Sequence, residues 1–107
     1  MNTITTPQTR TEKLEALRAL VQSQTEQRYI NEGMPLHIIQ HDKLTRVKEG
    51  TKYAKIDRGS SGVYMVDQEG NIFGIKAYGV IHRGYYYGTL DTIHQYNWGG
   101  YTARKIN

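Results

Sequence analysis

The character of the chain changes near residue 51, and this change limits the fold more than any other feature of the sequence. Before it, Leu14, Leu17 and Val21 recur at helical spacing. After it, glycines and other turn-forming residues separate short runs of β-branched and aromatic residues. Helical periodicity predicts a helix, and short alternating runs between turns predict strands. The sequence therefore predicts an α+β fold, in which an N-terminal amphipathic helix packs on a small antiparallel sheet of three to five strands.

The predicted helix spans about residues 9–32. The stretch Thr9-Arg10-Thr11-Glu12 matches a capping box, in which the threonine hydroxyl and the glutamate carboxylate each accept a hydrogen bond from the other residue's backbone. Gly33-Met34-Pro35 is typical of a helix end. Residues 1–8 are polar and are expected to form a flexible lead-in.

Residues 33–51 are expected to form a connector with room for one helical turn. Within it, Leu36 to Ile39 is compatible with either a short strand or the start of a helix. The stretch from Lys43 to Gly50 is polar, with Leu44 and Val47 as its apolar residues. This second stretch is therefore interpreted as part of the connector.

The β-rich part is predicted to span residues 52–107. Two turn-rich linkers separate its first three runs, so a three-stranded antiparallel meander is expected. The three strands are Lys52 to Asp57, Val63 to Asp67 and Ile72 to Tyr78. After them we expect an irregular or hairpin stretch from Gly79 to Gly88, followed by a short helix that starts within Thr89 to Ile93. Trp98 is expected to be a packing residue at a turn, and residues Tyr101 to Ile106 are expected to form a last strand.

Size and composition limit the class of protein. A chain of 107 residues has the size of one domain, which we place at residues 9–107. It has no cysteine, so disulfides and thiolate zinc sites are excluded. No apolar run is long enough to cross a bilayer, and the N-terminus lacks the pattern of a secretory signal. We therefore expect a cytoplasmic protein without membrane contact.

Alternation along the predicted strands assigns side chains to the two faces of the sheet. The set expected to pack against the helix comprises Ala54, Ile56, Phe73, Ile75 and Ala77. The set expected on the opposite face comprises Tyr53, Lys55, Lys76 and Tyr78. In the middle strand both assignments remain open.

The basic excess and the aromatic residues occupy the same part of the chain. Lysine and arginine outnumber aspartate and glutamate by seven to six over residues 1–50 and by seven to four over residues 51–107, and eight of the nine tyrosines lie in the second part. Tyrosine rings can stack on bases while cationic groups neutralise phosphates. Tyrosine is also an ordinary strand residue, and no known nucleic-acid motif is present. The coincidence nevertheless favours nucleic acid as the partner.

Two further stretches are candidate binding segments. The stretch Arg58-Gly59-Ser60-Ser61-Gly62 is interpreted as a plain hairpin loop, and the alternative is an anion site in which its amides and hydroxyls hold a phosphate or carboxylate. Arg83 precedes the run Gly84-Tyr85-Tyr86-Tyr87-Gly88, in which Tyr85 and Tyr87 are expected to face one way and Tyr86 the other. This run is either a recognition loop for nucleic acid or protein, or a strand with one side in the core.

The histidines are the candidate metal ligands and acid–base groups. His37 and His41 are spaced i, i+4 with Asp42 adjacent, and a second set comprises His82, Asp91 and His94. Whether either set clusters in space stays open at this point. The sequence shows no nucleophile paired with a base. We therefore expect no metal, no cofactor and no enzymatic activity.

Four stretches of the second half carry a resemblance to known proteins: Lys52 to Gly62, Tyr64 to Asp67, Ile72 to Lys76 and Gly88 to Ile93. Together they resemble small uncharacterised proteins that bacteriophages and other mobile elements encode. The resemblance implies a small accessory protein in the cytoplasm of a host cell. It assigns no activity and no functional residues.

The function expected is that of a non-enzymatic accessory protein that binds nucleic acid through a face of tyrosines and lysines. The residues expected to carry it are Tyr53, Lys55, Lys76, Tyr78, Arg83 and Tyr85. The alternative is an inhibitor or adaptor that captures a host protein, such as a defence enzyme, through the loop from Tyr85 to Tyr87. The oligomeric state stays open.

Overall fold

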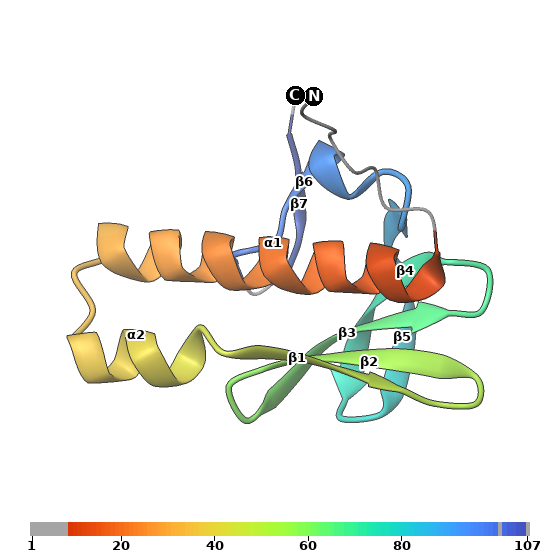
Figure 1. Ribbon diagram of the computed structural model, residues 1–107, viewed down its shortest axis with the longest axis horizontal. Helices are drawn as coiled ribbons and strands as arrows, with labels where there is room; N and C mark the ends of the chain where they lie inside the picture. Colours follow the sequence, from red (N-terminus) through yellow and green to blue (C-terminus); the bar gives the residue numbers. More distant parts are fainter. Residues whose placement is uncertain (1–8, 101, 107) are drawn as a thin grey trace, which may run out of the picture.

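The computed structural model describes residues 9–100 and 102–106, and the predicted lead-in over residues 1–8 lies outside this part of the chain. Figure 1 shows a long helix lying over an antiparallel sheet, with a short second helix after it. The helices are α1 (Arg10–Asn31) and α2 (Leu36–Asp42), with a short 3-10 helix, η1 (Ile93–Gln95). The strands are β1 (Thr45–Glu49), β2 (Tyr53–Arg58), β3 (Ser61–Asp67), β4 (Asn71–Ala77), β5 (Val80–Thr89), β6 (Tyr96–Asn97) and β7 (Arg104–Lys105). The predicted α+β fold is confirmed.

Helix α1 begins and ends where its terminal residues predict. The Thr9 hydroxyl accepts from the Glu12 amide and the Glu12 carboxylate accepts from the Thr9 amide, each at 3.1 Å. At the other end Gly33 has a φ of +70°, and the amide of Met34 donates to the carbonyl of Tyr29 at 3.0 Å. Glycine adopts this left-handed conformation without strain, so the chain reverses here and continues into α2.

The sheet is an antiparallel meander in the order β1-β2-β3-β4-β5. The three predicted strands correspond to β2, β3 and β4, and the strands at the two edges are the ones that the sequence pattern does not assign. Residues 79–88, for which an irregular or hairpin stretch is expected, belong mostly to the long edge strand β5. Its pairing with β4 shifts register at three places, which breaks the alternation by which strands are recognised.

The predicted connector over residues 33–51 contains more regular structure than expected, because it holds both α2 and β1. The stretch from Leu36, which fits a strand or a helix start, is helical. Strand β1 pairs with β2 alone, and its single buried residue is Thr45. Because β1 is an edge strand with polar side chains, it lacks the apolar alternation that predicts strands.

The core lies between α1 and one face of the sheet. Leu14, Leu17 and Val21 of α1 are buried, as their spacing predicts. They belong to one cluster with six residues of the sheet, namely Ala54, Ile56, Tyr64, Val66, Ile72 and Tyr87. Cross-strand pairing places Ala54, Val66 and Ile72 side by side, and Ile56 opposite Tyr64. This settles the assignment of the middle strand: Tyr64 and Val66 point inward.

The face assignment of β4 is wrong. Phe73 pairs with Met65, which pairs with Lys55, so Phe73 lies on the face turned away from the core cluster. Its neighbour Ile72 fills the inward position, and Ala77 is exposed. Both Ile72 and Phe73 are apolar, so alternation alone does not decide between them, and the register shifts beyond Phe73 remove a consistent period.

Trp98 fastens the C-terminal segment to the core, as its expected packing role predicts. The side chain is fully buried, and its indole N–H donates to the carbonyl of Ile93 at 2.9 Å. Its ring packs edge-on against Tyr64 at 5.1 Å. A Cβ at Gly99 would overlap the carbonyl of Gln24, so only glycine permits this approach to α1. In place of the expected helix from Thr89, the chain turns and forms η1.

Leu17→Ala should lower the free energy of unfolding by about 2–5 kcal/mol, because it leaves a cavity under α1. The matched control is Leu36→Ala on α2, where the side chain is 68% exposed; its effect should stay within about 0.5 kcal/mol. Urea denaturation followed by Trp98 fluorescence measures both. Equal losses in the two variants would contradict the packing of α1 on the sheet.

Candidate functional site

The sheet face opposite the core cluster, called here the outer face, carries a row of paired side chains across four strands. Lys55, Met65, Phe73 and Tyr86 are successive cross-strand partners. Met65 and Phe73 are almost fully buried, although they lie on the side away from α1. The ring of Tyr86 packs on Phe73 at 5.6 Å, and the guanidinium of Arg83 lies 5.4 Å from the Phe73 centroid. In this part of the outer face, the apolar side chains of Met65 and Phe73 are therefore buried, and the ring of Tyr86 and the guanidinium of Arg83 pack against Phe73.

A second part of the outer face is built around the ring of Tyr78. The ammonium groups of Lys55 and Lys48 lie 5.1 Å and 5.8 Å from the centroid of this ring. Lys48 also donates to the Tyr78 hydroxyl at 3.3 Å, and this hydrogen bond is the main reason that the pKa of Lys48 is raised. The hydroxyl in turn donates to Asp57 at 3.1 Å. Two cations and one carboxylate thus surround a half-exposed aromatic ring.

Arg83 links the first part of the outer face to the start of β2, and Lys55 belongs to both parts. The Arg83 guanidinium donates to the Tyr53 hydroxyl at 2.7 Å. The structure therefore brings together five of the residues singled out from the sequence, which are Tyr53, Lys55, Tyr78, Arg83 and Tyr86. It adds Lys48, as well as Arg46, which pairs across the strands with Asp57. Arg46 and Lys48 both lie on β1. The sequence does not predict their place on the outer face, because residues 33–51 are interpreted as a connector without strands.

Lys76, Tyr85 and Tyr87 lie apart from this group. Lys76 is exposed, and no hydrogen bond or ion pair joins its side chain to another residue of the described ranges. Tyr87 is buried in the core cluster, and the centroid of its ring lies 5.7 Å from that of Tyr64. Tyr85 stacks on His82 at 4.4 Å, with the two rings 12° from parallel. The expected alternation holds, since Tyr85 and Tyr87 share one side of β5 and Tyr86 faces the other.

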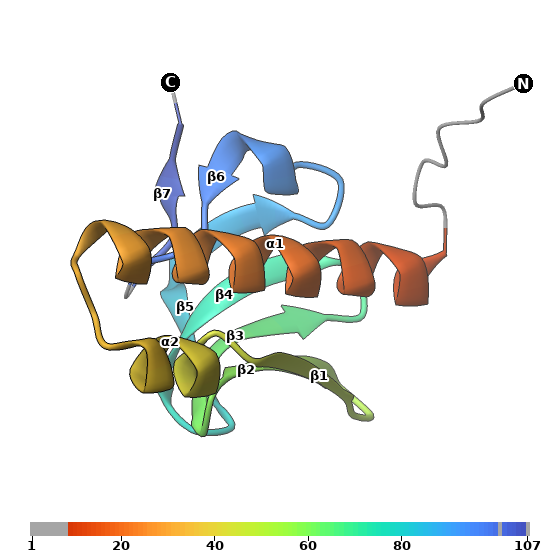
Figure 2. The same cartoon turned by 60° about the vertical axis from the view of Figure 1, so that its left-hand side comes forward.

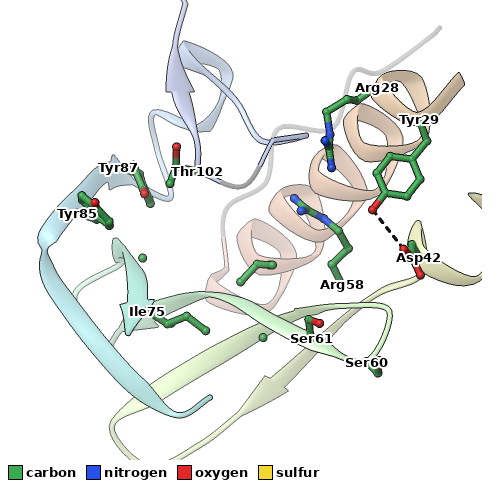
Figure 3. A pocket seen from close by; sticks show the side chains of 13 residues that line it. Arg28, Tyr29, Asp42, Arg58, Ser60, Ser61, Ile75, Tyr85, Tyr87 and Thr102 are labelled. Atoms are coloured by element: carbon green, nitrogen blue, oxygen red, sulfur yellow. Dashed lines mark hydrogen bonds between the residues drawn. The ribbon is translucent and has the colours of Figure 1, made fainter. Parts of the chain in front are cut away.

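A pocket of about 320 Å³ opens where α1, the β2–β3 turn and the segment after Trp98 meet (Figure 3). Arg58 enters it from the end of β2 and is only 8% exposed. Its guanidinium donates to the carbonyls of Trp98 at 2.7 Å and Gly100 at 3.2 Å. Arg28 of α1 donates to the carbonyl of Gly99 at 2.5 Å. Two guanidinium groups from different elements therefore lie along one pocket.

The opposite rim of the pocket is a hydrogen-bonded chain of polar side chains. The Tyr29 hydroxyl donates to one oxygen of Asp42 at 3.2 Å, and the ring of His41 contacts the other at 2.6 Å. The hydrogen bond from His41 is the main cause that lowers the pKa of Asp42. The hydrogen bond from Tyr29 and the positive charge of Arg58 lower this pKa further. Asp42 is therefore a carboxylate whose two oxygens are already engaged.

The turn at residues 58–62 is a tight hairpin turn, which agrees with the plain hairpin loop that the sequence favours over an anion nest. Gly59 has a φ of +58°, and its amide donates to the carbonyl of Leu44 at 2.6 Å. This amide is therefore not available to a ligand. Ser60 and Ser61 line the pocket beside Arg58. An anion in the pocket would therefore contact the side chains of this turn, because the Gly59 amide already donates to Leu44.

The candidate histidine sets are not assembled into a metal centre among the residues that the structure describes. Within residues 9–100 and 102–106, no group of three or more histidine, aspartate or glutamate side chains could hold a metal ion. His37 and His41 are both exposed on α2. In the second set, Asp91 forms an ion pair with Lys13 at 2.7 Å, and His82 lies against Tyr85. Neither set of candidate ligands is assembled.

Comparisons with protein-family models, curated proteins and solved structures find no match to this chain. The resemblance to proteins of bacteriophages and mobile elements therefore stays a prediction. Among the described residues, neither helix has both the length and the apolar character needed to span a membrane.

The buried Tyr64 hydroxyl predicts a loss of stability at high pH. Burial raises the pKa of Tyr64 from 10.0 to about 12, although the charge of Arg58 opposes this shift. Between these values the unfolded chain releases the proton while the folded protein retains it, so the free energy of unfolding falls as pH rises through this window. In Tyr64→Phe this contribution is absent, and its stability should fall less steeply than that of the wild type. Urea denaturation at a series of pH values measures the two slopes, and equal slopes would contradict the burial of this hydroxyl.

Proposed function

We propose that the protein binds single-stranded nucleic acid through the outer face and that it acts without catalysis. The observation that carries the proposal is the pairing of Lys48 with Lys55, directly opposite each other on β1 and β2. Like charges in this position destabilise a sheet. Asp57, 3.7 Å from the Lys48 ammonium, offsets part of this repulsion, and a polyanion lying along the two strands would give each ammonium a phosphate to face.

The aromatic residues of the same face supply the second half of the proposal. Tyr78 and Tyr86 are each 51% exposed, so part of each ring is open to solvent. Rings of this kind stack on any base, and stacking contributes about 1–3 kcal/mol for each base. Arg46, Lys48, Lys55 and Arg83 supply four cationic groups beside these rings, against the carboxylate of Asp57. Sequence preference should be small, because stacking and phosphate contacts do not read base edges.

Removal of the opposed lysines tests the electrostatic part. Lys48→Ala with Lys55→Ala should weaken binding to a mixed-sequence single-stranded oligonucleotide. Each lost phosphate contact should lower the slope of log K against log salt by about 0.7. The matched control is Arg104→Ala with Lys105→Ala, because both residues are exposed on β7, far from β1 and β2 in Figures 1 and 2. Fluorescence anisotropy at several salt concentrations gives the slopes. A wild-type protein that fails to bind at low salt would refute the proposal.

Substitution of Tyr86 tests the stacking part. Tyr86→Ala removes a half-exposed ring and should weaken oligonucleotide binding by about 1–3 kcal/mol. Tyr86→Phe keeps the ring and should bind like the wild type, since its hydroxyl makes only a long 3.5 Å contact with Asn71. The comparison is made by anisotropy at constant salt, with thermal denaturation as the check on folding. An equal loss in both variants would contradict stacking.

A pull-down with and without nuclease distinguishes this function from capture of a host protein. Under the proposal, a tagged copy recovers nucleic acid, and nuclease treatment removes whatever proteins accompany it. A single host protein that survives nuclease treatment and is lost in Tyr85→Ala would instead support the inhibitor or adaptor. Tyr85 is the appropriate residue because it is 50% exposed and lies off the outer face. An accessory role for a mobile element in the host cytoplasm would agree with either result.

A further inference from the structure

Arg58 is a buried cation that forms no direct ion pair with a carboxylate in the described part of the chain. It forms two hydrogen bonds to main-chain carbonyls, and no described carboxylate forms an ion pair with it. Its Nε is buried and has no hydrogen-bond partner among the described residues. A guanidinium has five N–H donors, and burying a charge without compensation is costly. The fold therefore holds a desolvated positive charge whose donors are incompletely used.

The surroundings of Arg58 are those of a small-molecule site. The pocket beside it has a volume of about 320 Å³, at the lower end of the range typical of such sites. Hydroxyl-bearing side chains from four parts of the chain line it together with Arg58: Tyr29, Ser60, Ser61, Tyr85, Tyr87 and Thr102. In Figure 3, the guanidinium of Arg58 extends towards that of Arg28, and the hydroxyls of Tyr85 and Tyr87 lie across the pocket from Asp42.

We propose that this pocket binds the phosphate group of a small phosphorylated ligand. A carboxylate presents two oxygens in one plane, whereas a phosphate presents three or more that accept from several directions. Donors that converge from a hairpin turn, a helix and β5 suit the second geometry better. Asp42, the carboxylate of the lining, accepts hydrogen bonds from Tyr29 and His41 and forms no hydrogen bond with Arg58. The site is separate from the outer face and does not depend on nucleic-acid binding.

The test is a titration of the full chain, labelled with ¹⁵N and followed by NMR. The probes are inorganic phosphate, ribose 5-phosphate as a phosphorylated polyol, and acetate as the carboxylate. Phosphate should shift the Arg58 Nε–H resonance and the amides of Ser60 and Ser61. Ribose 5-phosphate should bind more tightly, since it also reaches the hydroxyls of the pocket, and acetate should leave the Arg58 resonance in place.

A substitution at the rim keeps the test independent of the structural role of Arg58. Ser61 is exposed, so Ser61→Asp adds a negative charge at the pocket without removing a core contact. It should weaken phosphate binding about tenfold through repulsion. Thr51→Asp adds the same charge in the turn at the other end of β2. It should change the affinity for phosphate less than about twofold.

Three results would overturn the proposal. They are an unmoved Arg58 resonance at saturating phosphate, equal weakening by Ser61→Asp and Thr51→Asp, and acetate binding as tight as phosphate. Oligonucleotide affinity of Ser61→Asp, measured in parallel, should match that of the wild type because the outer face is unchanged. The two proposals therefore fail separately.

Discussion

The main chain of Trp98 joins three parts of the fold: helix α1, the strands β2 and β3, and the C-terminal segment that carries it. Its carbonyl accepts from Arg58 of β2 and from the Tyr64 hydroxyl of β3, and its amide donates to the Gln24 side chain of α1 at 2.6 Å. The indole fills the space between these elements. Because a buried carbonyl without partners is costly, these hydrogen bonds help to fix the sheet, the helix and the C-terminal segment relative to one another.

The parts of the fold that follow local rules are predictable from the sequence. A capping box and a glycine at the C-terminal end define α1, and turn residues define the three central strands. The edge strands are not predictable in this way. Most side chains of β1 are exposed and polar, so this strand shows no apolar alternation. The pairing of β5 with β4 shifts register, so the alternation of β5 is interrupted. The orientation of Phe73 depends on its pairing with Met65, which is tertiary information that alternation of one strand does not contain.

The candidate sites follow the same division. Tyr53 and Lys55 are placed correctly on one face because β2 alternates regularly up to its bulge after Ile56. Lys48 is missed because its strand is missed, although it completes the cluster around Tyr78. The pocket is built from residues 28 to 102, so no local pattern reveals it. Arg58 is the partial exception, since its place beside a glycine–serine turn indicates an anion site, while the groups that form the walls come from the tertiary fold.

The weak hydrophobicity of β1 has a consequence for how copies of the protein meet. An open sheet edge is a template on which another chain can add a strand, and aggregation commonly starts there. Here the one edge displays Arg46, Lys48 and Glu49 in solvent, and the other is distorted by bulges along β5. A second copy adding to either edge would have to desolvate charges or match an irregular ladder. The polar edge strand β1 and the irregular edge strand β5 are difficult to recognise from the sequence, and the same features oppose the addition of further strands to the sheet.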